Sequence, residues 1–158
     1  MEQPAWLPNM INVDGVWEEV LKRLYLIFEK DFILDKCHFR DLHIVWDTRK
    51  LDNQYDEGFW HLITREDNKI KDRLLDTPRA RRLSWCKPTI EHETDSIIKV
   101  WNYHESNNRI NTYIWLEYFD YLVIVQNRRN VFFLVTAFYI EGDSSRKRLR
   151  VKFDNRLI

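Results

Sequence analysis

The stretch Val131–Ile140, VFFLVTAFYI, is apolar at both alternating positions, and it decides what kind of sheet the chain can form. A strand with one side in solvent alternates apolar and polar residues, whereas a strand covered on both sides reads as a nearly continuous apolar run. We therefore expect both faces of this strand to be covered, or one face to form the floor of a cleft. The hydroxyl of Thr136 lies inside this run and needs a hydrogen-bonding partner there.

Other segments of the chain are also rich in β-branched and aromatic residues, and polar stretches that resemble turns separate them. This pattern predicts strands, and in the second half of the chain it predicts an antiparallel meander. The predicted strands besides Val131–Ile140 are Leu42–Asp47, Ile97–Tyr103, Thr112–Glu117, Tyr121–Gln126 and Leu149–Phe153.

Helical patterns dominate the first half. Asp14 is a candidate N-cap, and apolar residues then recur every three or four positions, which predicts an amphipathic helix to about Leu34. The charged segment 66–92 also reads as helical, with a restart at Asp76–Pro78 and a kink or end at Pro88. We expect an α+β fold, with helices packed on one face of a twisted antiparallel sheet of four to five strands.

The segment Gly58–Thr64, GFWHLIT, fits two structures. It can form a strand that pairs with Leu42–Asp47 across a long polar loop, which places His61 in the middle of a strand. A helix that begins near Phe59 is the alternative, and it places His61 and Arg65 on one face, four positions apart.

Length and composition indicate a single domain, because the chain has 158 residues of which 44% are hydrophobic. Residues 1–56 would form the N-terminal helix and first strand, and residues 57–158 the functional core. The 25 basic and 25 acidic residues balance, so the chain as a whole does not attract nucleic acid or anionic membranes. Cys37 and Cys86 indicate neither a disulfide framework nor a zinc site. Without a signal peptide or membrane segment, we expect a cytoplasmic protein with no membrane partner.

Four side chains in or near apolar segments are candidates for catalysis: His61, Arg65, Arg82 and Thr136. Together they would suit a phosphodiester, with imidazole to move a proton, guanidinium groups for the phosphate and a neutral hydroxyl to orient an oxygen. Each has a plainer explanation, as a half-buried histidine, a solvated arginine cluster or a good β-former. No cluster of carboxylates for divalent ions is evident, which favours attack by a ribose 2′-hydroxyl without a metal or other cofactor.

Local basic segments could still attract a polyanion. Ser145–Lys152, SRKRLRVK, contains five cations and no acid, and the turn NRRN contributes two more. The alternative is a solvated edge strand protected by its charge. The substrate-binding candidates in these segments are Arg128, Arg129, Lys147, Arg148 and Arg150.

The segments FWHLITRE, RARRLSW and VTAFYI, taken in this order, resemble the barnase, EndoU, colicin and RelE-like (BECR) ribonuclease superfamily, in its phage- and toxin-associated branches. The resemblance covers roughly Phe59–Phe153. It implies that His61 is the general base or acid, that Arg65 or Arg82 holds the scissile phosphate and that Thr136 contacts it. Tyr113 and Tyr139 would stack on or orient the substrate.

This resemblance implies a ribonuclease toxin that cleaves RNA to a cyclic phosphate without a metal, and that a cognate antitoxin or immunity protein neutralises. Two features depart from it, since the chain is neutral overall and no second histidine matches the motif. The alternative is a non-catalytic module, such as an antitoxin, an inhibitor or a phage accessory protein. Such a module would bind a protein through surface aromatics, for which Trp6, Trp46, Trp60 and Trp101 are candidates.

Overall fold

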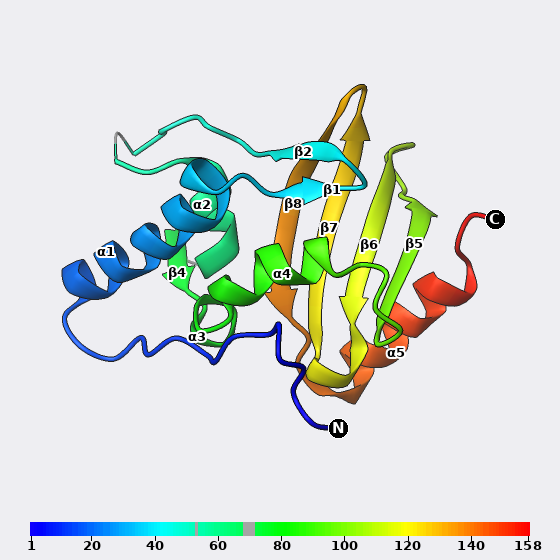
Figure 1. Cartoon of the computed structure of the whole chain (residues 1–158), viewed down its shortest axis with the longest axis horizontal. Helices are drawn as coiled ribbons and strands as arrows, with labels where there is room; N and C mark the ends of the chain where they lie inside the picture. Colours follow the sequence, from blue (N-terminus) through cyan, green and yellow to red (C-terminus); the bar gives the residue numbers. More distant parts are fainter. Residues whose placement is uncertain (53, 68–71) are drawn as a thin grey trace.

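The computed structural model describes residues 1–52, 54–67 and 72–158, and it confirms the predicted α+β class. Its main sheet has six strands in the order β1-β2-β8-β7-β6-β5, and β3 and β4 form a separate antiparallel pair (Figure 1). The strands are β1 (His38–Phe39), β2 (Leu42–Val45), β3 (Thr64–Asp67), β4 (Asp72–Leu75), β5 (Ile98–His104), β6 (Ile110–Leu116), β7 (Tyr121–Arg128) and β8 (Val131–Tyr139). The helices are α1 (Trp17–Phe28), the π-helix η1 (Glu29–Leu34), α2 (Glu57–Ile63), α3 (Thr77–Ala80), the 3-10 helix η2 (Leu83–Trp85), α4 (Cys86–Glu91), the 3-10 helix η3 (Glu117–Phe119) and α5 (Gly142–Asp154).

The predicted meander is confirmed for β5 to β8, which follow one another as antiparallel neighbours. The sheet is nevertheless larger than the expected four to five strands, and it is mixed. β2 lies parallel to β8, with Ile44 beside Phe132, and β1 pairs with β2 at the edge. A parallel pair needs a long crossover, and all the helices and strands from α2 to β7 lie between these two strands in the chain.

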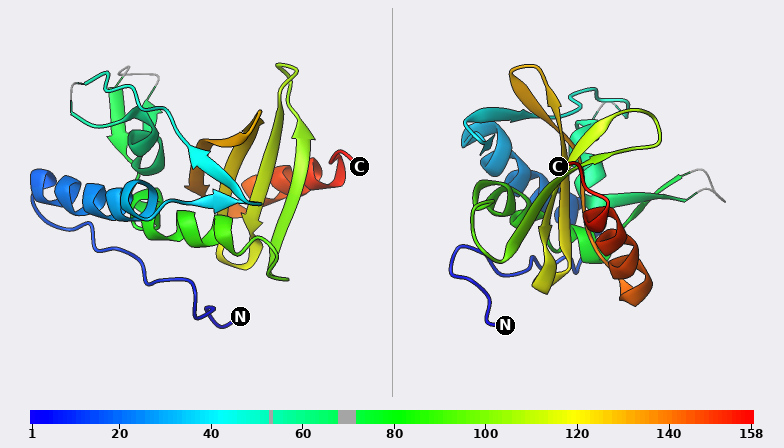
Figure 2. Two further views of the ribbon diagram at one scale, coloured as in Figure 1. Left: turned by 45° about the horizontal axis from the view of Figure 1, so that its top comes forward. Right: turned by 90° about the vertical axis from the view of Figure 1, so that its right-hand side faces the viewer.

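One face of β8 is buried, and the other is partly covered and partly lines a pocket. Phe132, Leu134 and Ala137 belong to the larger core, which also contains buried residues of α1, α2 and α4. Val135 and Phe138 pack against the second core, which α5 closes with Leu149. We call the side of the larger core face 1 and the side of α5 face 2. Figure 2 shows α5 on the opposite side of the sheet from α1.

The prediction that all helices pack on one face is therefore wrong for the C-terminal segment, where Leu149–Phe153 was expected to be a strand. Leu149 and Phe153 are four positions apart and both pack into the second core, which fits a helix. Val151 is 57% exposed, although in a strand it would point to the same side as Leu149. The segment Ser145–Lys152 is thus a helix face rather than a charged edge strand.

Segment 66–92 departs from the helical prediction in its first part, where the described residues belong to the β3–β4 pair and residues 68–71 lie outside the described residues. From Thr77 the segment is helical as predicted, in three short helices, α3, η2 and α4. The restart is confirmed, since Asp76 Oδ1 accepts a hydrogen bond from the Arg79 backbone N–H at 3.2 Å and Pro78 lies in the first turn of α3. Pro88 neither kinks nor ends a helix, because it lies in the first turn of α4 and needs no partner for its nitrogen.

In the first half of the chain, the structure differs from the prediction at the N-cap of the first helix, and it decides between the two alternatives for Gly58–Thr64. The N-terminal helix begins at Trp17 after Val16, so Asp14 is not its N-cap, and η1 continues it to Leu34. Gly58–Ile63 lies in α2, so the alternative of a helix is correct and the predicted hairpin with Leu42–Asp47 is wrong. Among the described helices, none is both long and apolar enough to cross a membrane.

Candidate functional site

Along the edge that faces away from β7, the beginning of β8 and its later residues have different neighbours. β2 pairs only with Val131–Phe133, and beyond that point α2 and α3 pack against β8 instead. A pocket of ≈ 360 Å³ lies where this edge meets β3 and β4. We call it the edge pocket. It is lined by His61, Thr64, Arg65, Glu66, Arg73, Arg79, Val135 and Thr136.

The end of α2 places His61 and Arg65 on two different elements that share the pocket. The hydroxyl of Thr64 donates to the carbonyl of Trp60 at 2.6 Å and closes the last turn of α2. Arg65 then lies on β3, immediately after the helix. His61 and Arg65 therefore lie on either side of a helix-to-strand junction. The prediction that a helix places both on one face is wrong for Arg65.

An ion pair inside the molecule fixes Arg73 on β4. Its guanidinium donates to both carboxylate oxygens of Glu57, at 2.7 and 3.2 Å, and Glu57 is buried. The guanidinium carbon also lies 5.5 Å from the ring centre of Trp60. A two-point contact of this kind restricts the orientation of the arginine more than a single hydrogen bond does. Arg73 thus reaches the pocket from a defined position.

Arg79 connects α3 with the end of α2. One terminal nitrogen, Nη1, donates to the carbonyl of His61 at 2.8 Å, and Nε lies 3.5 Å from Oδ2 of Asp76. The guanidinium is also 5.5 Å from the ring centre of Phe138 on β8. Burial lowers the pKa of Arg79 from its usual high value, but an arginine remains charged at neutral pH. Arg79 therefore brings a half-buried positive charge to the pocket and supports the backbone at His61.

A β-bulge turns Thr136 toward the pocket. Ile124 pairs with Thr136, but Val125 pairs with Leu134, so β8 has one extra residue, Val135, at this point. Thr136 shares the side of Ile124, which belongs to the second core, and it therefore lies on face 2. Thr136 is only half-buried. Thr136 thus lines a pocket that water or a ligand can enter, and its hydroxyl can find a hydrogen-bonding partner there.

Arginine side chains dominate the lining of the edge pocket, although Glu57 pairs with Arg73 and Asp76 lies 3.5 Å from Arg79 just outside it. The lining residues include three guanidinium groups, on Arg65, Arg73 and Arg79, and one carboxylate, on Glu66. Burial, and next the positive charge of Arg73, lower the pKa of His61 below its usual value. The imidazole is therefore neutral at pH 7 and is able to accept a proton from a bound group.

This lowered pKa predicts a pH dependence of stability. The unfolded chain binds a proton at His61 with the ordinary pKa of about 6.5, whereas the folded protein resists protonation to lower pH. The contribution of His61 is therefore complete above about pH 7 and is lost as the pH falls toward the folded pKa. We expect the difference in unfolding free energy between wild type and His61→Ala, from urea denaturation, to shrink between about pH 7 and about pH 5. A difference that stays constant over this range would contradict the assignment.

Arg82, the fourth predicted catalytic residue, does not line the edge pocket. Its Nη1 donates to the carbonyl of Pro78 at 2.8 Å, and its guanidinium carbon lies 3.9 Å from the ring centre of Tyr139 and 5.2 Å from that of Trp85. Arg82 points to Tyr139 on β8, and Trp85 is buried in the core. Arg82 is thus used in packing, and Arg79 takes the place at the pocket.

The two tyrosines predicted to contact substrate also lie outside the edge pocket. Tyr139 is half-buried beneath Arg82. Tyr113 is 2% exposed and stacks on Trp101 in the second core, with ring centres 5.0 Å apart. Its hydroxyl donates to Glu105 at 2.8 Å and accepts from Lys152 at 3.0 Å. A ring buried in this way is not available to stack on a base, so the structure gives no support to that role for Tyr113.

The basic side chains predicted to bind substrate are exposed but lie away from the lining of the edge pocket. Arg128 is on β7, and its guanidinium carbon lies 3.8 Å from the ring centre of Phe133. Arg129 is in the following turn, and Lys147, Arg148 and Arg150 are on α5. The edge pocket opens on face 2, the side that α5 covers, because Thr136 lies on that face. Arg128, which contacts Phe133, and the helix α5 therefore lie on the same side of the sheet as the pocket.

Sequence reasoning missed the three other charged residues of the pocket, Glu66, Arg73 and Arg79, as well as Thr64 and Val135. Arg79 belongs to the cluster PRARRLSW, in which the sequence does not tell which arginine faces the sheet. Glu66 and Arg73 were assigned to a helix, and only the pairing of β3 with β4 places them opposite each other. Thr64–Asp67, TRED, has no apolar residue, so its sequence contains no alternation that could predict a strand.

The other four histidines, all of which are described, do not line the edge pocket. The rings of His38 on β1 and His43 on β2 contact each other at a tilt of 43°, with ring centres 4.4 Å apart, and His92 stacks on Trp6. His104 is exposed at the end of β5. His61 alone of these five lines the edge pocket.

The described residues contain no cluster that could bind a metal, and no known protein matches the chain. Residues 1–52, 54–67 and 72–158 contain no group of three or more His, Cys, Asp or Glu side chains placed to hold a metal ion. Comparisons of the chain with protein-family models, curated proteins and solved structures find no match.

Proposed function

We propose that the edge pocket binds a phosphodiester of RNA and that the protein is a metal-independent endoribonuclease. The observation that carries the proposal is the convergence of His61, Arg65 and Thr136 on one pocket from α2, β3 and β8. Two further guanidinium groups reinforce its positive charge. A neutral imidazole beside several guanidinium groups is the arrangement that proton transfer at a phosphate requires.

The proposed reaction uses each group in a defined role. His61 accepts the proton of the ribose 2′-hydroxyl, the 2′-oxygen forms a bond to phosphorus, and the bond from phosphorus to the 5′-oxygen breaks. The leaving 5′-oxygen takes up a proton from water. Arg65 and Arg79 stabilise the charge on the phosphate, and the Thr136 hydroxyl orients one of its oxygens. The product is a cyclic phosphate.

RNA is the substrate that the proposal requires, and the cytoplasm is the compartment where the protein would meet it. A cell that makes such an enzyme needs to restrain it, so a cognate antitoxin or immunity protein is the proposed protein partner. The resemblance to ribonuclease toxins supports this part of the proposal.

RNA cleavage in excess EDTA tests the function directly. We expect a cyclic phosphate product from RNA and no cleavage of the same oligonucleotide with a 2′-deoxyribose at the cleavage position, because the nucleophile is then missing. Arg65→Ala protein, purified in parallel, should cleave at least about tenfold more slowly, since it lacks one cation at the phosphate.

A contaminating nuclease would cleave equally in both preparations. Intact RNA after long incubation with a high concentration of folded wild-type protein would contradict the proposal.

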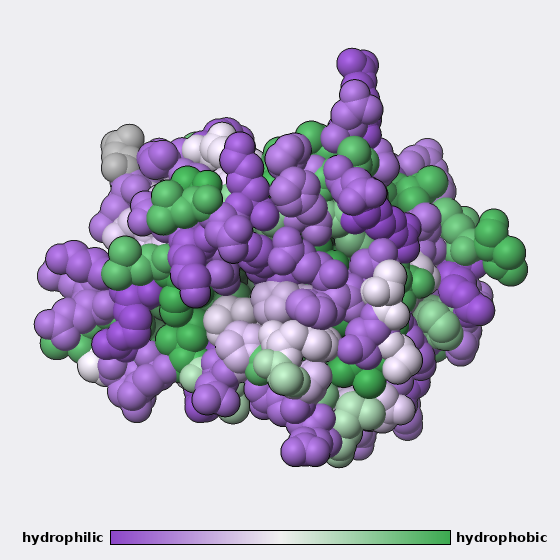
Figure 3. All heavy atoms as spheres, viewed as in Figure 1, coloured by the Kyte–Doolittle hydropathy of each residue, from purple (hydrophilic) through white to green (hydrophobic). Residues whose placement is uncertain are grey.

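A non-catalytic protein-binding module is the second candidate, and α1 with η1 supports it. Val16, Trp17, Leu26 and Leu34 are all exposed along this segment, and Leu34 is 74% exposed. Figure 3 shows separate apolar patches in a largely hydrophilic surface. The tryptophans predicted to form an interface are a poorer choice, because Trp60 and Trp101 are buried and Trp6 and Trp46 are half-buried. A stable complex whose isolated protein lacks nuclease activity would favour this candidate.

A further inference from the structure

A second pocket, of ≈ 520 Å³, lies at the end of the sheet that carries the β1–β2, β5–β6 and β7–β8 turns. We call it the amide pocket because three asparagines, Asn102, Asn108 and Asn127, line it. Gln126 also lines it, but its carboxamide donates to Asn111 and accepts from Arg128. Arg40, Arg109, Ile110, Thr112 and Phe132 complete the lining. It shares no lining residue with the edge pocket.

Tight turns build the rim of this pocket. Phe39 pairs with Leu42, so Arg40 and Asp41 alone form the β1–β2 turn, with φ of 50° and 65°. Two consecutive residues with positive φ are typical of a two-residue hairpin turn, which holds its side chains in fixed directions. Asn108 has φ of 64° in the β5–β6 turn. Short turns of this kind make the pocket largely preformed, which lowers the entropy cost of binding.

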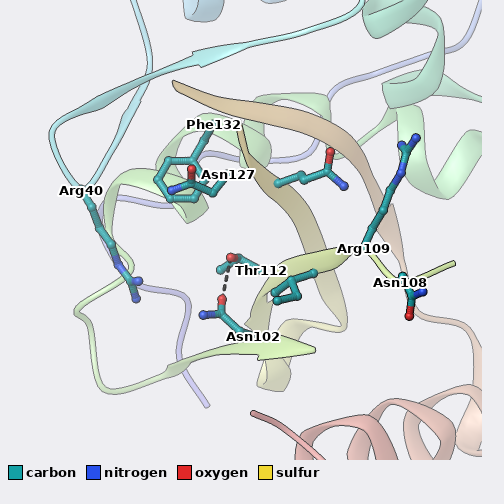
Figure 4. A pocket seen from close by; sticks show the side chains of 9 residues that line it. Arg40, Asn102, Asn108, Arg109, Thr112, Asn127 and Phe132 are labelled. Carbon is teal, nitrogen blue, oxygen red and sulfur yellow. Dashed lines mark hydrogen bonds between the residues drawn. The ribbon is translucent and has the colours of Figure 1, made fainter. Parts of the chain in front are cut away.

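The centre of the pocket contains an oriented carboxamide. The Thr112 hydroxyl donates to Oδ1 of Asn102 at 2.7 Å, so the Asn102 amide nitrogen remains to donate to a ligand (Figure 4). Thr112 is buried, and its strand pairs in register with Asn102, which fixes the contact. Asn127 and Phe132 lie across the pocket from this pair in Figure 4. The pocket thus offers donors and acceptors next to an aromatic ring.

The charge of the lining is positive. Arg40 and Arg109 lie on opposite sides of the Asn102–Thr112 pair in Figure 4, and no acidic residue lines the pocket. Arg40 is ion-paired with Glu93 at 3.2 Å, which leaves Arg109 as the stronger attraction for an anion. Guanidinium groups bind phosphate oxygens through paired donors.

We infer that the amide pocket binds a nucleotide. Carboxamides present a donor and an acceptor in one plane, which matches the edge of a nucleobase, and the arginines match its phosphate. The volume is within the range of small-ligand sites. The ligand is a free nucleotide or one unit of a single strand of nucleic acid, since both offer the same groups. This inference does not depend on the ribonuclease activity, because the residues of the two pockets are separate.

Side-chain amide signals in NMR spectra of the full chain test this inference. The probes are the four ribonucleoside monophosphates, ribose 5-phosphate, and a single-stranded hexanucleotide with 2′-O-methyl groups throughout, which cannot be cleaved by 2′-hydroxyl attack. We expect at least one monophosphate to shift the amide signals of Asn102 and Asn127 with a Kd of about 1 mM or tighter. A hexanucleotide that binds tenfold tighter identifies a strand as the source, and equal binding identifies the free nucleotide.

Variants at exposed positions separate binding from folding. Asn127→Ala and Arg109→Ala change exposed side chains, and each should weaken binding by about tenfold, as expected for the loss of a base or phosphate contact. Arg65→Ala should leave the shifts of the Asn102 and Asn127 amide signals unchanged, because Arg65 lines the edge pocket and not the amide pocket. Equal binding of ribose 5-phosphate would show an anion site without base recognition and would overturn the inference. The absence of any shift with every probe at about 10 mM would overturn it as well.

Discussion

Replacement of His61 by alanine is expected to lower the rate of RNA cleavage by a factor of about 10²–10⁴, the usual contribution of a positioned general base. The imidazole is the group of the edge pocket whose neutral form accepts a proton near pH 7, and its lowered pKa keeps it neutral there. The measurement is the initial rate of cleavage of a labelled oligonucleotide in EDTA. Circular dichroism and the unfolding midpoint establish that the variant is folded.

His104→Ala is the matched control for this experiment. His104 has the same side chain but is exposed at the end of β5 and does not line the edge pocket. Its replacement should leave the rate within about twofold of wild type, as for a surface change without a role in the transition state. Equal loss of activity in both variants, or no loss in His61→Ala, would contradict the role of His61.

Replacement of Gly58 by alanine is expected to destabilise the fold by about 1–3 kcal/mol, the usual cost of an overpacked site. A Cβ at this position would lie 2.7 Å from both Cβ and Cδ1 of Trp46, which is too close for two carbon atoms. Trp46 has little room to move, because its indole N–H donates to Asp56 at 2.9 Å and its ring packs against Phe28. The Gly58 backbone N–H also donates to the carbonyl of Asp47 at 2.8 Å.

The direction of the change in stability distinguishes the two opposing effects of Gly58→Ala, overpacking against Trp46 and higher helix propensity. Gly58 lies within α2, where helix propensity alone predicts that alanine stabilises by about 1 kcal/mol. Urea denaturation of the two proteins measures the difference. A gain in stability would show that the contact with Trp46 yields easily and would contradict the expectation. Because α2 carries His61, a displaced helix should also lower the cleavage rate.

Parts of the fold could be predicted because their signal is local. The double apolar pattern of Val131–Ile140 predicts that both faces are covered or that one forms the floor of a cleft, and in the structure one face is buried while the other packs partly against the second core and partly lines the edge pocket. The turns between β5 and β8 were also predictable, since polar residues interrupt the apolar runs there. The C-terminal helix was not, because Leu149, Val151 and Phe153 alternate like a strand and also contain the four-residue spacing of a helix. Only the second core, which accepts Leu149 and Phe153 and leaves Val151 outside, decides between the two.

The sequence by itself determined the class of the fold, the meander and the residue types of the candidate site, because apolar periodicity and side-chain chemistry are properties of short segments. Tertiary structure alone decided which of these side chains meet. β2 stops pairing with β8 after Phe133, and this leaves the edge to α2, α3 and the β3–β4 pair. A bulge at Val135 then presents Thr136 beside His61, and Arg79 replaces Arg82 at the pocket. These are contacts between distant segments, and no local pattern specifies where one strand ends against another.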